Sequence, residues 1–159
     1  MSQPIAEITI RPARKTDMSF IFSFSSVLAE GAKLDWHKGE TVQTFQRDYI
    51  AEMMAETSLR NITLILERNG IASGFIHARE RKDDISGEVC GTVPLLAIKE
   101  EAQGFGAGRL LLEAAEDWAK TQGFRLLHLE VFSTNEPARG FYQNLGFKPE
   151  TINLIKPLG

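Results

Sequence analysis

The stretch Gln103-Gly104-Phe105-Gly106-Ala107-Gly108 joins two segments of opposite character. Before it lies an apolar run, residues 92–98, whose continuous hydrophobic end is typical of a centrally buried strand. After it lies the segment 109–121, whose apolar residues recur on one helical face. Alternate glycines at such a turn leave bare backbone N–H groups at the positive end of a helix dipole, an arrangement that binds phosphate. We call residues 103–108 the glycine loop, and it predicts a phosphorylated ligand.

The remaining sequence predicts strands and helices that surround this loop. Asn69-Gly70 is a favoured centre for a two-residue hairpin turn. Pro94 removes one ladder hydrogen bond, which predicts a bulge or an unpaired edge nearby. The expected strands are 8–11, 62–67, 71–79, 88–98, 124–132 and one or two within 147–158, and the expected helices begin at Thr16, Thr41, Arg109 and Asn135.

This order of elements predicts a mixed α/β (α+β) fold. We expect a central, mixed, largely antiparallel sheet of about six to seven strands, with one right-handed βαβ crossover and helices on both faces. The length of 159 residues suits one domain, so residues 1–159 are expected to form it.

Charge, cysteine count and the N-terminal residues indicate which partners and which cellular compartment to expect. The net charge of −3 gives no reason to expect nucleic acid or an anionic membrane as a partner. Cys90 is the only cysteine, so no disulfide within the chain, no cysteine cluster and no metal are expected. Residues 1–10 lack the pattern of a secretory signal, and a cytoplasmic location is expected.

Two nucleotide-binding interpretations of the glycine loop fail. A dinucleotide site needs a small residue where Arg109 stands, and only 29 residues follow Glu130, too few for a second half. A triphosphate loop needs Gly-Lys-Ser/Thr, which is missing here. A glycine-rich turn without a ligand remains an alternative for the loop taken alone.

Two separate blocks of sequence resemble one family. The glycine loop matches the Gln/Arg-x-x-Gly-x-Gly/Ala pattern of the GNAT superfamily of acyl-CoA-dependent N-acetyltransferases, with residues 96–98 before it and Leu111-Leu112 after it. The second block runs through Leu129-Glu130-Val131, Asn135, Ala138, Phe141-Tyr142 and Leu145-Gly146-Phe147 at the family's spacing. The resemblance covers roughly the C-terminal 60 residues and implies acetyl-CoA as cosubstrate.

The resemblance assigns a cofactor site to the loop and the strand before it. The pyrophosphate is expected against the N–H groups of the loop, with Gln103 as a neutral donor and Arg109 as either a compensating cation or a solvated helix residue. The pantetheine arm is expected to bind as an added strand along backbone. The expected cofactor residues are Leu96, Ala97, Ile98, Gln103, Gly104, Phe105, Gly106, Ala107, Gly108, Arg109 and Asn135.

The resemblance also implies catalytic and acceptor residues. Tyr142 matches the general acid that protonates the leaving thiolate, with helix packing as the alternative. Glu130 is the candidate base, although it could instead only bind the amine, and His77 or a water relay could replace it. The acceptor is expected over residues 32–40 and 81–87, with Trp36, Asp35 and His77 as candidate contacts.

The function expected is N-acetyl transfer from acetyl-CoA to a primary amine by direct attack in a ternary complex. The alternatives are a non-catalytic acyl-CoA-binding module, suggested by the lack of an acid in residues 93–96, and transfer of another acyl group. A homodimer is possible through a terminal edge strand.

Overall fold

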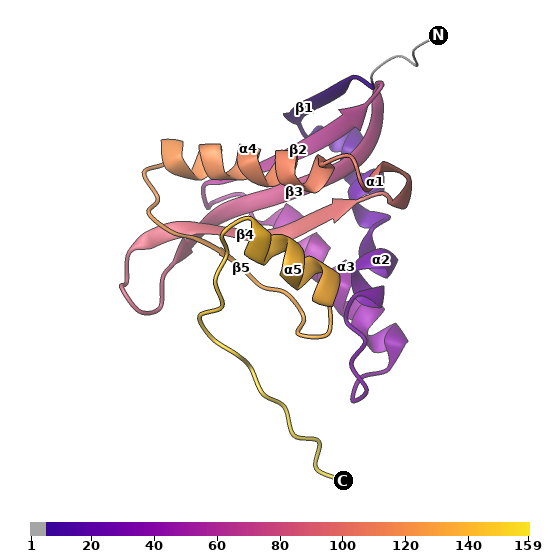
Figure 1. Cartoon of the computed structure of the whole chain (residues 1–159), viewed down its shortest axis with the longest axis vertical. Coiled ribbons are helices and arrows are strands. Elements are labelled where there is room, and N and C mark those ends of the chain that lie inside the picture. The colour runs from indigo at the N-terminus through magenta and orange to yellow at the C-terminus, as the bar shows by residue number, and fades with distance from the viewer. Residues whose placement is uncertain (1–5) are drawn as a thin grey trace.

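The computed structural model describes residues 6–159, which form one five-stranded sheet in the order β1-β2-β3-β4-β5 (Figure 1). The first four strands pair antiparallel with their neighbours, and β5 runs parallel to β4. The strands are β1 Ile8–Pro12, β2 Asn61–Arg68, β3 Ile71–Lys82, β4 Val89–Ile98 and β5 Leu127–Leu129. The mixed, largely antiparallel sheet and its crossover are therefore confirmed.

Helices cover both faces of the sheet, as expected (Figure 1). One core includes Ile21, Ile50, Phe75 and Leu95 and lies under α1 to α3. The other includes Ile76, Val93, Leu111 and Leu112 and lies under α4 and α5. The helices are α1 Met18–Phe22, α2 Ser25–Glu30, α3 Gly39–Ala55, α4 Ala107–Thr121 and α5 Glu136–Asn144, with short 3-10 turns η1 Lys15–Asp17 and η2 Glu100–Ala102.

The turn between β2 and β3 has the backbone that Asn-Gly favours. Asn69 has φ 53° and Gly70 has φ 78°, the two positive angles of a tight hairpin turn. Arg68 and Ile71 pair directly across it. The predicted hairpin is confirmed.

Pro94 lies in a β-bulge, as its missing N–H predicted. His77 pairs with Leu95 and Arg79 pairs with Thr92, so two residues of β4 lie opposite Ala78. The extra residue reverses the side-chain alternation: Val93 packs in the core under α4, whereas Leu95 packs in the core under α1 to α3. The bulge thus sets which face each later residue of β4 occupies.

The sheet has fewer strands than the sequence predicted. The expected strand 124–132 pairs only over Leu127–Leu129, and residues 147–158 form no strand in the part of the chain described. The chain leaves β5 early because residues 130–134 turn toward α2, where the Thr134 hydroxyl donates to the Ala32 carbonyl. The last residues then run away from the sheet, so no neighbouring strand satisfies their backbone (Figure 1).

Thr16 and Thr41, at which two helices were expected to begin, do not cap those helices. The Asp17 carboxylate accepts the Arg14 N–H at 2.7 Å, so this acid, rather than Thr16, fixes the turn before α1. The helix α3 begins at Gly39, two residues before Thr41, after an extended Lys38. None of the helices described is long and apolar enough to span a lipid bilayer.

Candidate active site

The glycine loop presents free backbone donors at the start of α4. Gly104 and Gly106 have φ 88° and 74°, left-handed angles that turn the chain from β4 into the helix. Gly106 is the N-cap residue and offers no side-chain cap. Among residues 6–159, no group accepts a hydrogen bond from the N–H of Phe105, Gly106, Ala107 or Gly108. These four donors stand at the positive end of a 15-residue helix, a site suited to an anion.

Side chains around the loop differ in what they offer. The Gln103 amide lies 3.4 Å from the Ile98 carbonyl. Arg109 forms an exposed ion pair with Glu113, one helical turn further on, at 3.0 Å. A cation that sequence reasoning missed lies closer: the Arg68 guanidinium covers the Phe105 ring at 3.8 Å, and its buried Nε has no hydrogen-bond partner among the residues described.

The third glycine of the loop allows two helices to approach. A Cβ on Gly108 would lie 3.1 Å from Cζ of Phe141, closer than ordinary van der Waals contact. The start of α4 therefore packs directly against α5, which carries Tyr142.

Beyond the bulge, β4 has an open edge on the side away from β3. Its pairing with β5 ends at Val93 and Leu129, whereas its pairing with β3 continues to Ile98. The Lys99 N–H donates to the Ser73 carbonyl at 2.8 Å, so the backbone N–H of Lys99 points toward β3. Backbone groups alternate, so those of Ala97 face β3, and those of Leu96 and Ile98 face the open edge. The unpaired edge that Pro94 predicted is therefore present.

Tyr142 lies in α5, which Asn135 caps by accepting the Ala138 N–H at 3.4 Å. Its ring contacts those of Phe141 and Phe147, with centroids 5.5 Å and 5.8 Å away. Burial raises the pKa of the Tyr142 hydroxyl above its usual value. The phenol is therefore protonated at neutral pH, the state that a proton donor requires.

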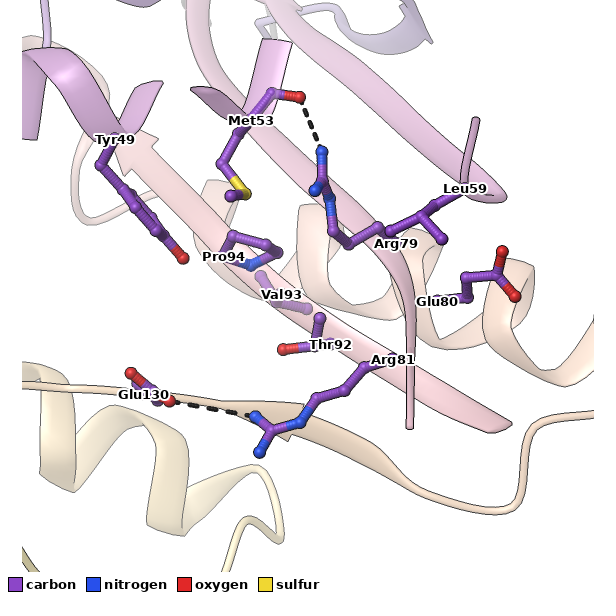
Figure 2. A pocket seen from close by; sticks show the side chains of 10 residues that line it. All are labelled: Tyr49, Met53, Leu59, Arg79, Glu80, Arg81, Thr92, Val93, Pro94 and Glu130. Carbon is purple, nitrogen blue, oxygen red and sulfur yellow. Dashed lines mark hydrogen bonds and ion pairs between the residues drawn. The ribbon is translucent and has the colours of Figure 1, made fainter. Parts of the chain in front are cut away.

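Glu130 follows β5 directly and lies at a surface pocket of about 340 Å³ (Figure 2). Its side chain is 91% exposed and lies 3.9 Å from Arg81. In Figure 2 the Tyr49 hydroxyl points toward Glu130 from the opposite wall. The pocket is lined by Tyr49 and Met53 of α3, Leu59, Arg79, Glu80 and Arg81 of β3, Thr92, Val93 and Pro94 of β4, and Glu130.

Arg79 organises the wall of this pocket and was also missed. It is only 7% exposed, donates to the Met53 carbonyl at 2.7 Å, and donates through Nε to His77 Nε2 at 3.2 Å. The signal available in sequence was an arginine within an otherwise buried strand, where a charge needs partners. Tyr49 carried no such signal, because it belonged to the apolar stripe of its helix.

The acceptor residues expected from sequence are not brought together. His77 is buried, contacts Thr63 Oγ1 through Nδ1 at 2.7 Å, and does not line the pocket. Burial, with a smaller contribution from Arg79, lowers the pKa of His77 to about 4. Asp35 and Trp36 are exposed in the segment between α2 and α3, and neither lines the pocket. The roles of these three residues stay predictions.

A family model described as the acetyltransferase (GNAT) family matches residues 29–147. The chain belongs to this family. The resemblance seen in the two sequence blocks is thereby confirmed, and the GNAT match extends into the N-terminal half, where the sequence offered no specific motif.

Individual acetyltransferases match shorter stretches of the chain. Mycothiol acetyltransferase of Jonesia denitrificans is 40% identical over 67 residues, which cover 41% of this chain and 21% of that protein. Ribosomal protein bS18-alanine N-acetyltransferase of Salmonella typhimurium is 40% identical over 57 residues, which cover 36% of this chain and 38% of that protein. The chain thus matches less than half the length of each of these two relatives.

A solved structure shares the whole fold. The aminoglycoside N-acetyltransferase AAC(6′)-Iy in complex with CoA has a TM-score of 0.64 at 18% identity, covering 100% of this chain and 99% of that chain. Identity this low shows a common fold and no more.

Proposed function

We propose that this GNAT protein transfers an acetyl group from acetyl-CoA to a primary amine by direct attack within a ternary complex. One observation carries the proposal: four free N–H groups on the glycine loop lie next to the open edge of β4. Acetyl-CoA combines a diphosphate with an amide-bearing arm, and these two features match those two surfaces. The CoA complex of the structural neighbour supports the same cosubstrate.

The cofactor binds through backbone for most of its length. The diphosphate accepts hydrogen bonds from the N–H groups of Phe105 to Gly108, and Arg68 adds the positive charge that neutral Gln103 lacks. The pantetheine amides pair with Leu96 and Ile98 as an added strand, which displaces the weak Gln103 contact to the Ile98 carbonyl.

The acetyl transfer then needs two proton movements. The amine nitrogen attacks the thioester carbonyl carbon, and the bond between that carbon and sulfur breaks. Tyr142 donates its proton to the departing thiolate, and the proton of the amine passes to Glu130, through water because that carboxylate is exposed. Cys90 is fully buried, so no covalent acetyl-cysteine step is proposed.

The pocket beside Glu130 receives the acceptor amine. Its wall holds two arginines, Arg79 and Arg81, and two acids, Glu80 and Glu130, so its formal charges balance. This balance favours an acceptor without a large positive charge, because several cationic amines would meet no excess of carboxylates. The named relatives act on different acceptors, so their names favour no single amine.

Calorimetric titration with CoA, pantetheine and ADP tests the cofactor site. We expect CoA to bind with measurable heat, and pantetheine to bind at least about 10-fold more weakly because it lacks the diphosphate. Absence of heat with CoA would contradict the proposal at its foundation.

A thiol-release assay with acetyl-CoA tests the transfer itself. The panel contains a peptide with a free N-terminal alanine, lysine, a polyamine and an aminoglycoside. We expect thiol release above background with at least one amine. CoA binding without release on a broad panel would instead support the non-catalytic acyl-CoA-binding module, and faster release from a longer acyl-CoA would identify a different acyl donor.

A further inference from the structure

We propose that Asp83, Cys90 and His128 form a zinc site at the end of the sheet opposite the glycine loop. The three residues come from the turn after β3, from β4 and from β5, so no local sequence motif marks them. One ligand atom from each lies within 4.8 Å of the other two. The single cysteine predicted that no cysteine cluster could form, but a mixed sulfur, nitrogen and oxygen site needs only one.

The distances are close to those of a tetrahedral metal site. Zinc bonds of 2.0–2.3 Å at tetrahedral angles place ligand atoms roughly 3.4–3.6 Å apart. In this structure His128 Nε2 lies 2.8 Å from Asp83 Oδ1, where a proton holds the pair. Replacing that proton by a metal ion requires this pair to open by less than 1 Å. The Cys90 sulfur, at up to 4.8 Å from the other ligand atoms, must move inward by up to about 1.3 Å.

The ligands are oriented by their surroundings. The second oxygen of Asp83, Oδ2, accepts from the Ser86 N–H at 2.8 Å and from the Ser86 hydroxyl at 2.9 Å. This leaves Oδ1 directed at His128, as a second layer of hydrogen bonds orients ligands in known metal sites. The backbone of Asp83 is also held, by bonds to the Glu88 carbonyl and from the Gly87 N–H, each at 2.8 Å.

Burial and ligand type favour zinc over a hard cation. Cys90 is fully buried and the Asp83 side chain is 4% exposed, so an ion here would be shielded from bulk water. The His128 side chain is 19% exposed, which gives a route of entry and leaves room for water as a fourth ligand. One thiolate with one imidazole and one carboxylate is a zinc-type set, whereas calcium and magnesium prefer oxygen alone.

The set is not a nucleophilic triad, although it contains a thiol, an imidazole and a carboxylate. A catalytic cysteine must reach its substrate, and Cys90 has no exposed surface. A bound ion would instead tie the β3–β4 turn to β5. Asp83 lies two residues after Arg81, and His128 lies two residues before Glu130. A shared ion would therefore restrain the part of the pocket wall that Arg81 and Glu130 form.

Cobalt substitution tests the site in the full chain after treatment with a chelator. We expect stoichiometric cobalt to give the visible bands of a tetrahedral ion and a thiolate-to-cobalt charge-transfer band, both removed by zinc. Cys90→Ser should abolish the charge-transfer band. Ser86→Ala should weaken cobalt affinity about 10-fold, because the Ser86 hydroxyl no longer orients the Asp83 carboxylate.

Matched controls separate this site from adventitious binding. His37→Ala removes an exposed histidine and Asp84→Asn removes the exposed acid next to Asp83, and neither should change the cobalt spectrum. Absence of the charge-transfer band in the wild-type chain, or its persistence in Cys90→Ser, would overturn the proposal. The contact between Asp83 and His128 would then be only a hydrogen bond that fixes the turn.

A second measurement needs no variant and covers the case in which one fails to fold. Crystals grown with zinc should show an anomalous peak between Asp83, Cys90 and His128. An anomalous map with no peak there, from crystals at saturating zinc, would also overturn the proposal.

Discussion

Tyr142 is one of two tyrosines in the chain, and each faces a different part of the proposed reaction. Its neighbours are aromatic rings, and burial raises the pKa of its hydroxyl. Tyr49 lines the pocket proposed for the acceptor, across from Glu130 (Figure 2). Substituting each tyrosine in turn therefore distinguishes loss of the proposed acid from loss of a proposed contact with the acceptor.

We predict that Tyr142→Phe lowers kcat about 100-fold with little change in the KM for acetyl-CoA, because the thiolate loses its proton donor. Tyr49→Phe should leave kcat near that of the wild type and raise the KM for the amine. Steady-state thiol release measures both. Equal kcat for Tyr142→Phe and the wild type would assign Tyr142 to packing.

Asp17 is a buried acid that carries several charged hydrogen bonds. Its carboxylate accepts from Arg11 at 2.8 Å and 2.9 Å and from the Arg14 N–H at 2.7 Å. The hydrogen bond from Arg11, which outweighs burial, lowers the pKa of Asp17 to about 2. Because the folded pKa lies below the unfolded value of 3.8, this stabilisation is complete above that value and is lost as the pH falls through about 2.

We predict that Asp17→Asn lowers the free energy of unfolding by about 2 kcal/mol at pH 7, since the charge-assisted bonds to Arg11 are weakened. The difference from the wild type should shrink as the pH falls from 4 toward 2. Urea denaturation across this range measures it. Asp48→Asn, at an exposed acid, is the control and should change little; a constant difference for Asp17→Asn at all pH values would contradict the linkage.

At the scale of elements, the contact between α4 and α5 joins the helix that follows the glycine loop to the helix that carries Tyr142, the proposed acid. Gly108 allows this contact, because a Cβ there would lie 3.1 Å from Phe141 Cζ. Gly140, on α5 itself, has nothing within 4 Å of the same atom position. Both glycines are helical, so alanine changes helix propensity in the same direction at each site.

We predict that Gly108→Ala lowers kcat, because Phe141 must move and carries Tyr142 with it. Gly140→Ala, the control, should leave kcat unchanged and raise the free energy of unfolding by up to about 1 kcal/mol. Thermal unfolding and thiol release distinguish the two effects. If Gly108→Ala behaves as Gly140→Ala does, the contact between helices does not position the acid.

The shape of the sheet near the site follows from one element, β4. Its pairing with β3 runs to Ile98, its pairing with β5 stops at Val93, and the bulge at Pro94 lies where the two differ. Proline has no backbone N–H to donate to a neighbouring strand, and the open edge of β4 begins at this residue. The open edge proposed for the pantetheine arm is thus a consequence of where the pairing between β4 and β5 ends.

At the scale of the whole molecule, the C-terminal segment is the part least engaged with the rest. Ile152, Leu154, Ile155 and Leu158 are between 54% and 88% exposed. The segment runs away from the sheet, and β5 is an edge strand (Figure 1). Apolar side chains and an unpaired edge together are typical of association between chains.

We therefore predict that the full chain is a dimer in solution and that a chain ending at Glu150 is a monomer with the same far-ultraviolet circular dichroism. Light scattering after gel filtration measures the mass of each. A monomeric full chain, or a dimer that survives the truncation, would contradict a role of this segment in pairing.

The sequence was enough for those features that short-range physics determines. Asn69-Gly70 produced its hairpin because few residues accept two positive φ angles, and Pro94 produced its bulge because it has no N–H. The glycine loop and α4 followed from glycine spacing and helical periodicity, and the two motif blocks identified the family. Strand ends were less predictable, because pairing depends on a neighbour: residues 147–158 are apolar enough for a strand but lie beside none.

What only the tertiary structure decided was which distant side chains meet. The sequence suggested His77 as a candidate acceptor contact, and packing buries it against Arg79. Packing rather than any motif brings Tyr49, Arg79 and Arg81 to one pocket with Glu130. The same is true of Asp83, Cys90 and His128, which are separated along the chain and joined by strand register. Backbone conformation is local and can be inferred from a few neighbouring residues. Which side chains of different strands meet depends instead on the register of the strands and on the face that each residue occupies. A single bulge in β4 changes both.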